Sequence, residues 1–273
     1  MDANRAITAT APNAQPGRDE ISPEHFVPDH VFVYITKGTL RAHDGHKSYT
    51  LPAGACCLVR KNHLVRYEKG NGQPTFERVV ICFEESFLRY FQERHQPDLN
   101  PACPAGAFIP IVEDPRIVDF INSLAPYTDE SGRIHAAFAA VKHEELLIIL
   151  LQRQPALAGL LFTYGMPGKV DLEEFMNKNY IFNTSIQNFA FLTGRSLSAF
   201  KRDFYKIFRL TPSRWLIQKR LQEAYFLIEN NKKPVDIYLE LGFEDLSHFS
   251  FAFRKLFGCT PTALAAGAGS RAT

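Results

Sequence analysis

Hydroxyl, imidazole and cationic side chains recur at helical spacing in two segments near the C-terminus of this 273-residue chain. The first set is Ser198, Lys201, Arg202 and Tyr205, and the second is Ser247, His248, Ser250 and Arg254. On the outer face of a helix, such side chains can reach base edges in the major groove of double-stranded DNA. These two sets of side chains therefore predict hydrogen bonds to DNA bases.

Further cations flank each set and suit the phosphates of DNA better than its bases, because phosphate contacts depend mainly on charge. We expect phosphate contacts from Arg195, Lys206 and Lys255, and from the neighbouring pair Lys232 and Lys233.

Three side chains in these segments have competing interpretations. Ser198 and Ser247 lie near predicted helix starts, where a hydroxyl either serves the helix start or contacts DNA. Phe251 either contacts a thymine methyl group or packs against a neighbouring helix. We favour packing for Phe251, because large apolar side chains are more often buried.

The elements that must position these side chains occur twice, 49 positions apart. The same residue type recurs at six equivalent positions of Leu197–Phe208 and Leu246–Phe257, and a Thr-Pro pair follows each copy. Further upstream, we match Ile186, Ala190 and Leu192 with Val235, Leu239 and Leu241. An internal repeat is a structural unit used twice, and two such units can bind a repeating ligand at two sites.

Each copy predicts a short helix, a glycine-containing turn and a second amphipathic helix, which is the helix-turn-helix arrangement. In the second helices, Phe200 and Phe204, and likewise Phe249 and Phe253, are four residues apart and form a stripe that we expect to be buried. If both second helices enter successive major grooves of DNA, their centres lie about 34 Å apart.

Capping residues predict where the helices of this region begin. Thr184 or Ser185 starts the first helix of the first copy, and Ser196 starts its second helix, which runs to Phe208. Thr211-Pro212 starts a long helix that runs to Glu229 and separates the two copies.

These residues resemble the AraC/XylS family of bacterial transcription regulators over about residues 170–265. The most specific part is the second copy, where the family has Gly-Phe, Ser-x-Phe-Ser, Phe-Lys or Phe-Arg, and Phe-Gly-x-Thr-Pro. This chain has Gly242-Phe243, Ser247-His248-Phe249-Ser250, Phe253-Arg254 and Phe257-Gly258-Cys259-Thr260-Pro261. The resemblance implies a sequence-specific DNA-binding regulator, often an activator that helps to recruit RNA polymerase. It also implies a cupin-like sensing domain followed by a dimerisation helix pair.

The chain departs from the family pattern in its second copy. Phe251 stands where the family often has Arg, and residues 235–241 replace an Ala-rich helix. We therefore expect the second unit to bind DNA more weakly, or to read DNA shape instead of bases. The first copy, with Lys201 and Arg202, then carries more of the charge-assisted contacts, and the DNA site is asymmetric.

Composition bounds the class of protein. Residues 169–273 hold 15 Lys and Arg against 10 Asp and Glu, whereas residues 1–168 hold 16 against 19. The basic part carries the repeat, which suits a polyanion such as DNA. The five cysteines include no Cys-x-x-Cys, which argues against a disulfide framework and fits the cytoplasm. No apolar run reaches 18 residues, so we expect no membrane span.

The N-terminal half predicts a small all-β domain followed by helices. Residues 26–83 contain about six short strands, with a hairpin turn at Asp44-Gly45, and suggest a barrel or sandwich. Helices are expected over Glu84–Glu93, Asp114–Leu124 and Ile134–Gln152. The apolar face of the last two either covers the barrel or joins two copies of the chain, and we favour self-association.

Three histidines of the β-rich half raise the question of a metal site. His43 and His46 bracket the hairpin turn and point at solvent, and His63 has no close acidic partner. Because metal ligands must converge, we expect neither a metal nor another cofactor. The barrel interior is left open to a small apolar effector, a protein partner or nothing.

We therefore expect two domains, an all-β cupin-like barrel with a helical dimerisation segment over 21–160 and an all-α bipartite helix-turn-helix domain over 168–266. A disordered tail over 1–20, a linker over 154–168 and a flexible tail over 267–273 complete the chain. The predicted function is a cytoplasmic, homodimeric transcription regulator that is not an enzyme. The alternative is a cupin-type ligand-binding protein or enzyme whose helical half is a scaffold.

Overall fold

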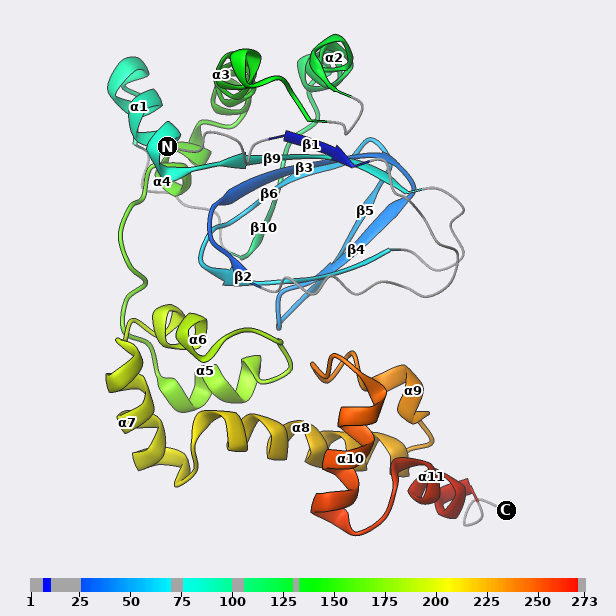
Figure 1. The fold of residues 1–273 in the computed structure, drawn as a ribbon. Helices are drawn as coiled ribbons and strands as arrows, with labels where there is room; N and C mark the ends of the chain where they lie inside the picture. Colours follow the sequence, from blue (N-terminus) through cyan, green and yellow to red (C-terminus); the bar gives the residue numbers. More distant parts are fainter. Residues whose placement is uncertain (1–6, 11–25, 70–75, 100–105, 130–132, 270–273) are drawn as a thin grey trace. The chain divides into compact units, whose positions relative to one another are not determined.

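The computed structural model describes residues 7–10, 26–69, 76–99, 106–129 and 133–269. The chain divides into two compact units, and the main boundary falls between Gly165 and Met166. The first unit is rich in β-strands and the second is helical (Figure 1). The predicted fold class is thereby confirmed.

The first unit is built on antiparallel strands. They are β1 (Ile7–Thr10), β2 (Phe26–Val27), β3 (His30–Lys37), β4 (Thr39–His43), β5 (Ser48–Pro52), β6 (Cys56–Val59), β7 (His63–Leu64), β8 (Arg66–Lys69), β9 (Glu77–Phe83) and β10 (Phe108–Pro110). A five-stranded sheet has the order β1-β9-β3-β6-β10, a three-stranded sheet has the order β5-β4-β8, and β2 pairs with β7. The predicted hairpin turn joins β4 to β5, with Gly45 at φ 88°.

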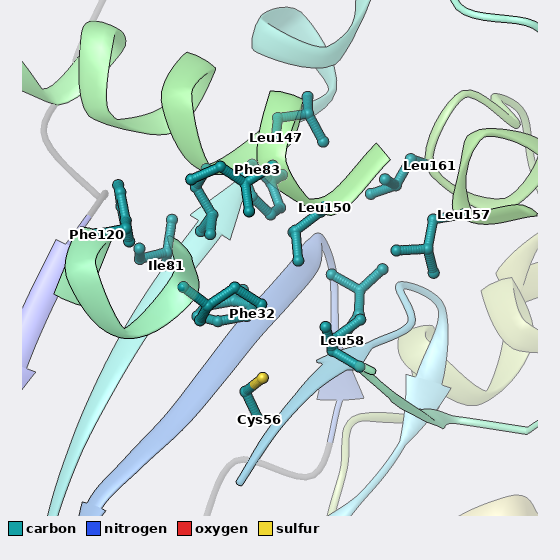
Figure 2. Packing of buried hydrophobic residues seen from close by; sticks show 14 of the residues in the cluster. Phe32, Cys56, Leu58, Ile81, Phe83, Phe120, Leu147, Leu150, Leu157 and Leu161 are labelled. Carbon is teal, nitrogen blue, oxygen red and sulfur yellow. The ribbon is translucent and has the colours of Figure 1, made fainter. Parts of the chain in front are cut away.

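The five-stranded sheet is buried on both faces, because successive side chains of a strand point to opposite sides. On one face, Phe32, Leu58 and Ile81 pack against the helices of the unit (Figure 2). On the other face, Val33 and Cys57 join a second core with side chains of the three-stranded sheet.

Four helices lie among the described residues of the first unit. They are α1 (Glu85–His95), α2 (Pro115–Ser123), α3 (Ala136–Arg153) and α4 (Ala158–Leu161), with 3-10 turns at Ala125–Tyr127 and Pro155–Leu157. The three helices expected in this region are confirmed, each to within two residues at either end. The helices contribute Phe120, Leu147 and Leu150 to the core that covers the sheet (Figure 2).

Three strands differ from the sequence-based expectation. Ile7–Thr10 lie inside the predicted disordered tail over 1–20 but pair with β9, and the rest of that segment lies outside the described residues. The single strand predicted over His63–Glu68 is interrupted at the buried Val65, and its two parts join different sheets. The short β10 was not predicted, because three residues show no periodicity.

The predicted linker over 154–168 is shorter than expected. Residues 155–161 are helical, and Leu157, Leu160 and Leu161 are buried in the core of the first unit. Beyond them, the Tyr164 ring packs against the same core, with the Arg89 guanidinium 4.0 Å from the ring centroid. Only the seven residues 165–171 then separate this packed segment from the next helix.

The second unit consists of helices. They are α5 (Leu172–Asn179), α6 (Ile186–Leu192), α7 (Leu197–Phe208), α8 (Pro212–Glu229), α9 (Pro234–Ile237), α10 (Leu246–Phe257) and α11 (Pro261–Gly269). The bounds predicted for the ends of α7 and α8 are confirmed, and Ser185 and Ser196 act as the expected N-caps. α11 was not predicted, and it reaches into the expected flexible tail over 267–273.

The repeat is visible in the fold, because α6, α7 and the start of α8 correspond to α9, α10 and α11 (Figure 1). The spacing of 49 holds for α7 and α10, but the turn glycines that follow α6 and α9, Gly194 at φ 66° and Gly242 at φ 80°, match at a spacing of 48. Buried Phe189 and Ala190 thus correspond to buried Ile237 and Tyr238. The predicted pairing of Ile186, Ala190 and Leu192 with Val235, Leu239 and Leu241 was wrong by one residue, since the second turn is one residue longer.

Candidate nucleic-acid interface

The second helix of the first copy, α7, is anchored by one face and exposed on the other. Phe200 and Phe204 are fully buried, and Phe204 lies 5.6 Å from Trp215 between ring centroids. The opposite face is exposed and carries five of the predicted DNA-contacting residues: Ser198, Lys201, Arg202, Tyr205 and Lys206. The structure therefore brings these side chains together on one solvent-facing surface.

The equivalent helix of the second copy, α10, is anchored in the same way. Phe249 and Phe253 are fully buried, and Phe253 lies parallel to Tyr225 of α8, with ring centroids 6.2 Å apart. Of the predicted residues on this helix, Ser250 is half-buried, and the others are exposed: Ser247, His248, Arg254 and Lys255. The N-terminus of α10 is capped by Asp245, which accepts a hydrogen bond of 2.6 Å from the backbone nitrogen of His248.

The prediction that Phe251 packs against a neighbouring helix is wrong. Its side chain is 70% exposed, on the face of α10 opposite Phe249 and Phe253. That preference was wrong, because the stripe that anchors α10 already fills the groove against α8 and leaves this position in solvent.

Arg195 is engaged inside the second unit, which corrects its prediction as a phosphate contact. Its guanidinium donates hydrogen bonds of 3.0 Å to the Val170 carbonyl and 2.7 Å to the Thr193 carbonyl. It also pairs with the Asp203 carboxylate at 3.5 Å, and its side chain is only 9% exposed. We therefore withdraw Arg195 from the candidate interface.

The same carboxylate holds Arg202 near the candidate interface. Nε of Arg202 lies 3.3 Å from Oδ1 of Asp203, while the Arg202 side chain stays 65% exposed. Burial acts to raise the pKa of Asp203, but hydrogen bonds from Arg202 and Arg195 outweigh it and leave the pKa below its usual value. Asp203 is thus ionised at neutral pH and can orient the Arg202 guanidinium toward solvent.

Sequence reasoning missed other cations of this unit. Arg209 and Arg214 are exposed on either side of the start of α8, where phosphates are favoured by the free N–H groups of a helix N-terminus. Arg209 adopts a left-handed conformation, with φ 56°, at the C-terminus of α7. Their signal in the sequence is only their position next to Thr211-Pro212. Lys232 and Lys233, which were predicted, are also exposed.

Arg220 is buried and connects the two copies. Its guanidinium donates to three backbone carbonyls: Tyr180 at 2.7 Å and Phe182 at 2.9 Å, before the first copy, and Gly242 at 2.9 Å, in the turn of the second. Because Arg220 itself lies on α8, the contacts join three elements that position α7 and α10. The sequence could have revealed Arg220, because the four-residue spacing of Leu216, Ala224 and Ile228 predicts that position 220 is buried.

The histidines considered as metal ligands have other contacts. Nδ1 of His43 accepts a hydrogen bond from the Gly45 nitrogen at 3.0 Å, and His46 is exposed. Nδ1 of His63 lies 2.9 Å from the Lys61 carbonyl oxygen. Within the described ranges, no three or more His, Cys, Asp or Glu side chains are grouped as a metal site would need. None of the described helices is long and apolar enough to cross a membrane.

Comparisons with known proteins match both units. Residues 30–160 match the ExsA N-terminal regulatory domain, and residues 189–267 match a helix-turn-helix domain. The chain is 35% identical over 237 residues to the virulence regulon transcriptional activator VirF of Yersinia enterocolitica, covering 84% of this chain and 86% of VirF. It is 33% identical to the thermoregulatory protein LcrF of Yersinia pestis, with the same coverage. It is 27% identical to the transcriptional regulator ExsA of Pseudomonas aeruginosa, covering 84% of each chain.

The close approach at Gly242 gives a test of the Arg220 junction. A Cβ at Gly242 would lie 2.6 Å from the Ile181 carbonyl oxygen and 3.0 Å from Cζ of Arg220, and φ is 80°. We expect Gly242→Ala to lower the free energy of unfolding by about 1–2 kcal/mol from the left-handed backbone and by about 1–3 kcal/mol more from overpacking. Urea unfolding followed through the fluorescence of the one tryptophan, Trp215, reports on this unit in the full chain.

Gly258→Ala is the matched control, because Gly258 has a similar φ of 76° but no atom within 4 Å of its added Cβ. It should lose only the backbone contribution. Equal losses in the two variants would contradict a close junction at Gly242.

Proposed function

The chain belongs to the AraC family of transcription regulators, and we propose that it activates transcription by placing α7 and α10 in successive major grooves of promoter DNA. The observation that carries this proposal is the exposed polar and cationic face of α7, held by the buried Phe200 and Phe204. Side chains that project from a rigid helix can read base edges, and flanking cations neutralise phosphates. The relatives VirF and ExsA are named as a transcriptional activator and a transcriptional regulator.

Within this interface we assign roles by chemistry and exposure. Arg202 and Lys201 are proposed to contact bases, together with the hydroxyls of Ser198 and Tyr205 on α7. On α10 the base contacts are proposed for Ser247, His248, Ser250 and Arg254. Lys206 and Lys255, joined by Arg209 and Arg214, are proposed to contact phosphates.

The compartment and the class of activity follow from this ligand. A promoter-binding regulator acts where the chromosome is, so we place the chain in the bacterial cytoplasm. Binding of DNA requires no bond to be made or broken, and we propose no enzymatic activity. An activator acts on RNA polymerase, which we infer to be its second macromolecular partner.

We further propose that two copies of the chain pair through α2 and α3. A groove of about 620 Å³ between these helices is lined by Phe120, Val141 and Ile148, among others. Val141 is 62% exposed, and Phe138, one turn before it on α3, is 45% exposed. An apolar surface of this kind on a regulator is best explained by a partner that covers it.

The charges around the groove support a second copy as that partner. Arg116 pairs with Asp114 at 2.7 Å, and Lys142 pairs with Glu145 at 2.8 Å. Together with Asp119 and Glu144, which also line the groove, Arg116 and Glu145 of these pairs form a polar rim around an apolar centre, which is the usual anatomy of a protein interface. In a dimer with a two-fold axis, the same surface of each copy faces the other, so a second copy of the chain can cover the apolar groove.

The first unit is also where we infer regulation to act. Its match is described as a regulatory domain, and its sheet carries one core on each face. A small molecule or a protein that binds this unit could change the pairing of α2 and α3. The ligand would then alter promoter binding through the dimer.

A gel-shift assay tests the DNA proposal at Arg202. We expect Arg202→Ala to weaken binding to a duplex selected from a random pool by about 5- to 150-fold, which corresponds to about 1–3 kcal/mol for one base contact. Binding to unselected DNA should change much less. If the chain gives no specific shift at low salt, the proposal fails.

Lys206→Ala is the control for charge alone. It should weaken binding to selected and unselected duplexes alike, and reduce the dependence of log affinity on log salt by about one. If Arg202→Ala behaves like Lys206→Ala, Arg202 contacts phosphate and reads no base.

Analytical ultracentrifugation tests the pairing of two copies. Val141→Asp places a charge on the exposed apolar lining of the groove, so it should convert dimer to monomer at micromolar concentration. Val112→Asp is the control, because Val112 is 47% exposed but lies outside α2 and α3. A dimer that survives Val141→Asp would exclude this surface.

A further inference from the structure

Phe251 has the largest exposed fraction among the large hydrophobic side chains of the described residues, at 70%. It lies in the middle of α10, whose position is fixed by the buried Phe249 and Phe253. The ring is therefore held out in solvent on a rigid element. A phenyl ring held in this way is suited to be buried against a complementary apolar group.

The first copy has a guanidinium at the same place. α7 and α10 are in register at a spacing of 49, so Arg202 and Phe251 occupy equivalent positions on equivalent helices. The side chains of both are exposed, 65% for Arg202 and 70% for Phe251. The two helices thus present opposite chemistry from one shared scaffold.

The neighbours of Phe251 indicate what it faces. Ser247, one turn before it, and Arg254, one turn after it, are exposed on the same side of α10. These are the side chains proposed above to enter the major groove. The apolar group that the major groove offers is the C5-methyl of thymine, and the other groups on its base edges are hydrogen-bond donors and acceptors.

We propose that Phe251 is a specificity-determining residue that recognises thymine through its 5-methyl group in the half-site under α10. This inference rests on the proposed function, since it requires α10 to enter the groove. It makes the two half-sites chemically different: the half-site under α7 is read by a cation, and the half-site under α10 is read by an aromatic ring. A DNA site with thymine in one half-site is the expected result.

Replacement of thymine by deoxyuridine tests this inference, because it removes the methyl group and changes no hydrogen-bonding group. The full-length chain first selects a duplex from a random pool. Each thymine of the selected duplex is then replaced singly, and affinity is measured by fluorescence anisotropy. At one or two positions the unsubstituted chain should lose about fourfold in affinity, the equivalent of about 0.8 kcal/mol for one buried methyl group.

The Phe251→Ala variant should bind the thymine duplex more weakly and lose no further affinity on substitution at those positions. Phe251→Leu, which keeps an apolar side chain, should retain part of the sensitivity. Arg202→Ala is the matched control, and it should keep the full deoxyuridine effect. Because Phe251 is exposed, circular dichroism should show all three variants to be folded.

The outcomes separate the two proposals. If no sequence is enriched from the pool, the DNA-binding proposal is overturned and this inference with it. If a sequence is enriched but no thymine position is sensitive, this inference alone is overturned. It is also overturned if Phe251→Ala keeps the sensitivity, or if it binds the selected duplex as the unsubstituted chain does, as expected for a Phe251 that contacts a protein.

Discussion

The geometry of the second unit depends on one buried cation, Arg220. A guanidinium is costly to bury unless its donors are satisfied. Here three backbone carbonyls from two separate segments accept hydrogen bonds from it. Backbone carbonyls cannot move without moving their whole segment. The contacts therefore hold the two copies of the repeat in a fixed relation to α8, and with them the two helices that are proposed to read DNA. Two reading helices are useful only if their separation matches the repeat of the DNA helix.

Local features of the second unit were predictable. The ends of α7 and α8 follow from Ser196, Thr211-Pro212 and the pairs of phenylalanines, because caps and a four-residue stripe act within a few residues. The features that the sequence did not predict depend on contacts between residues distant in sequence. Arg195 and Arg220 look like surface cations until the folded chain brings carbonyls such as that of Val170 to them. The one-residue shift between α6 and α9 was hidden, because Leu192 and Leu241 align at a spacing of 49 and are both buried.

The first unit was predicted in outline but not in its pairing. Short strands and the Asp44-Gly45 turn are local signals, and they were read correctly. The addition of β1 to β9, and the break at Val65 between two sheets, are determined by which strands meet across the barrel. Register and partner choice in sheets depend on contacts far apart in the chain, so periodicity alone does not reveal them.

The packing of Tyr164 against the first unit leaves seven residues before α5. Within them, Arg195 donates to the Val170 carbonyl, and a Cβ at Gly194 would lie 2.7 Å from the backbone of Gly168, so residues 168–170 are packed on the second unit. The tether is then residues 165–167, which at about 3.5 Å per residue reach roughly 10 Å. In the proposed dimer, the two second units are thereby held at an effective concentration on the order of millimolar. Once one second unit has bound a promoter, binding of the other second unit of the dimer is in effect intramolecular. A small change in the pairing of the first units is then amplified into a large change in promoter occupancy, although no residue at the DNA surface has changed.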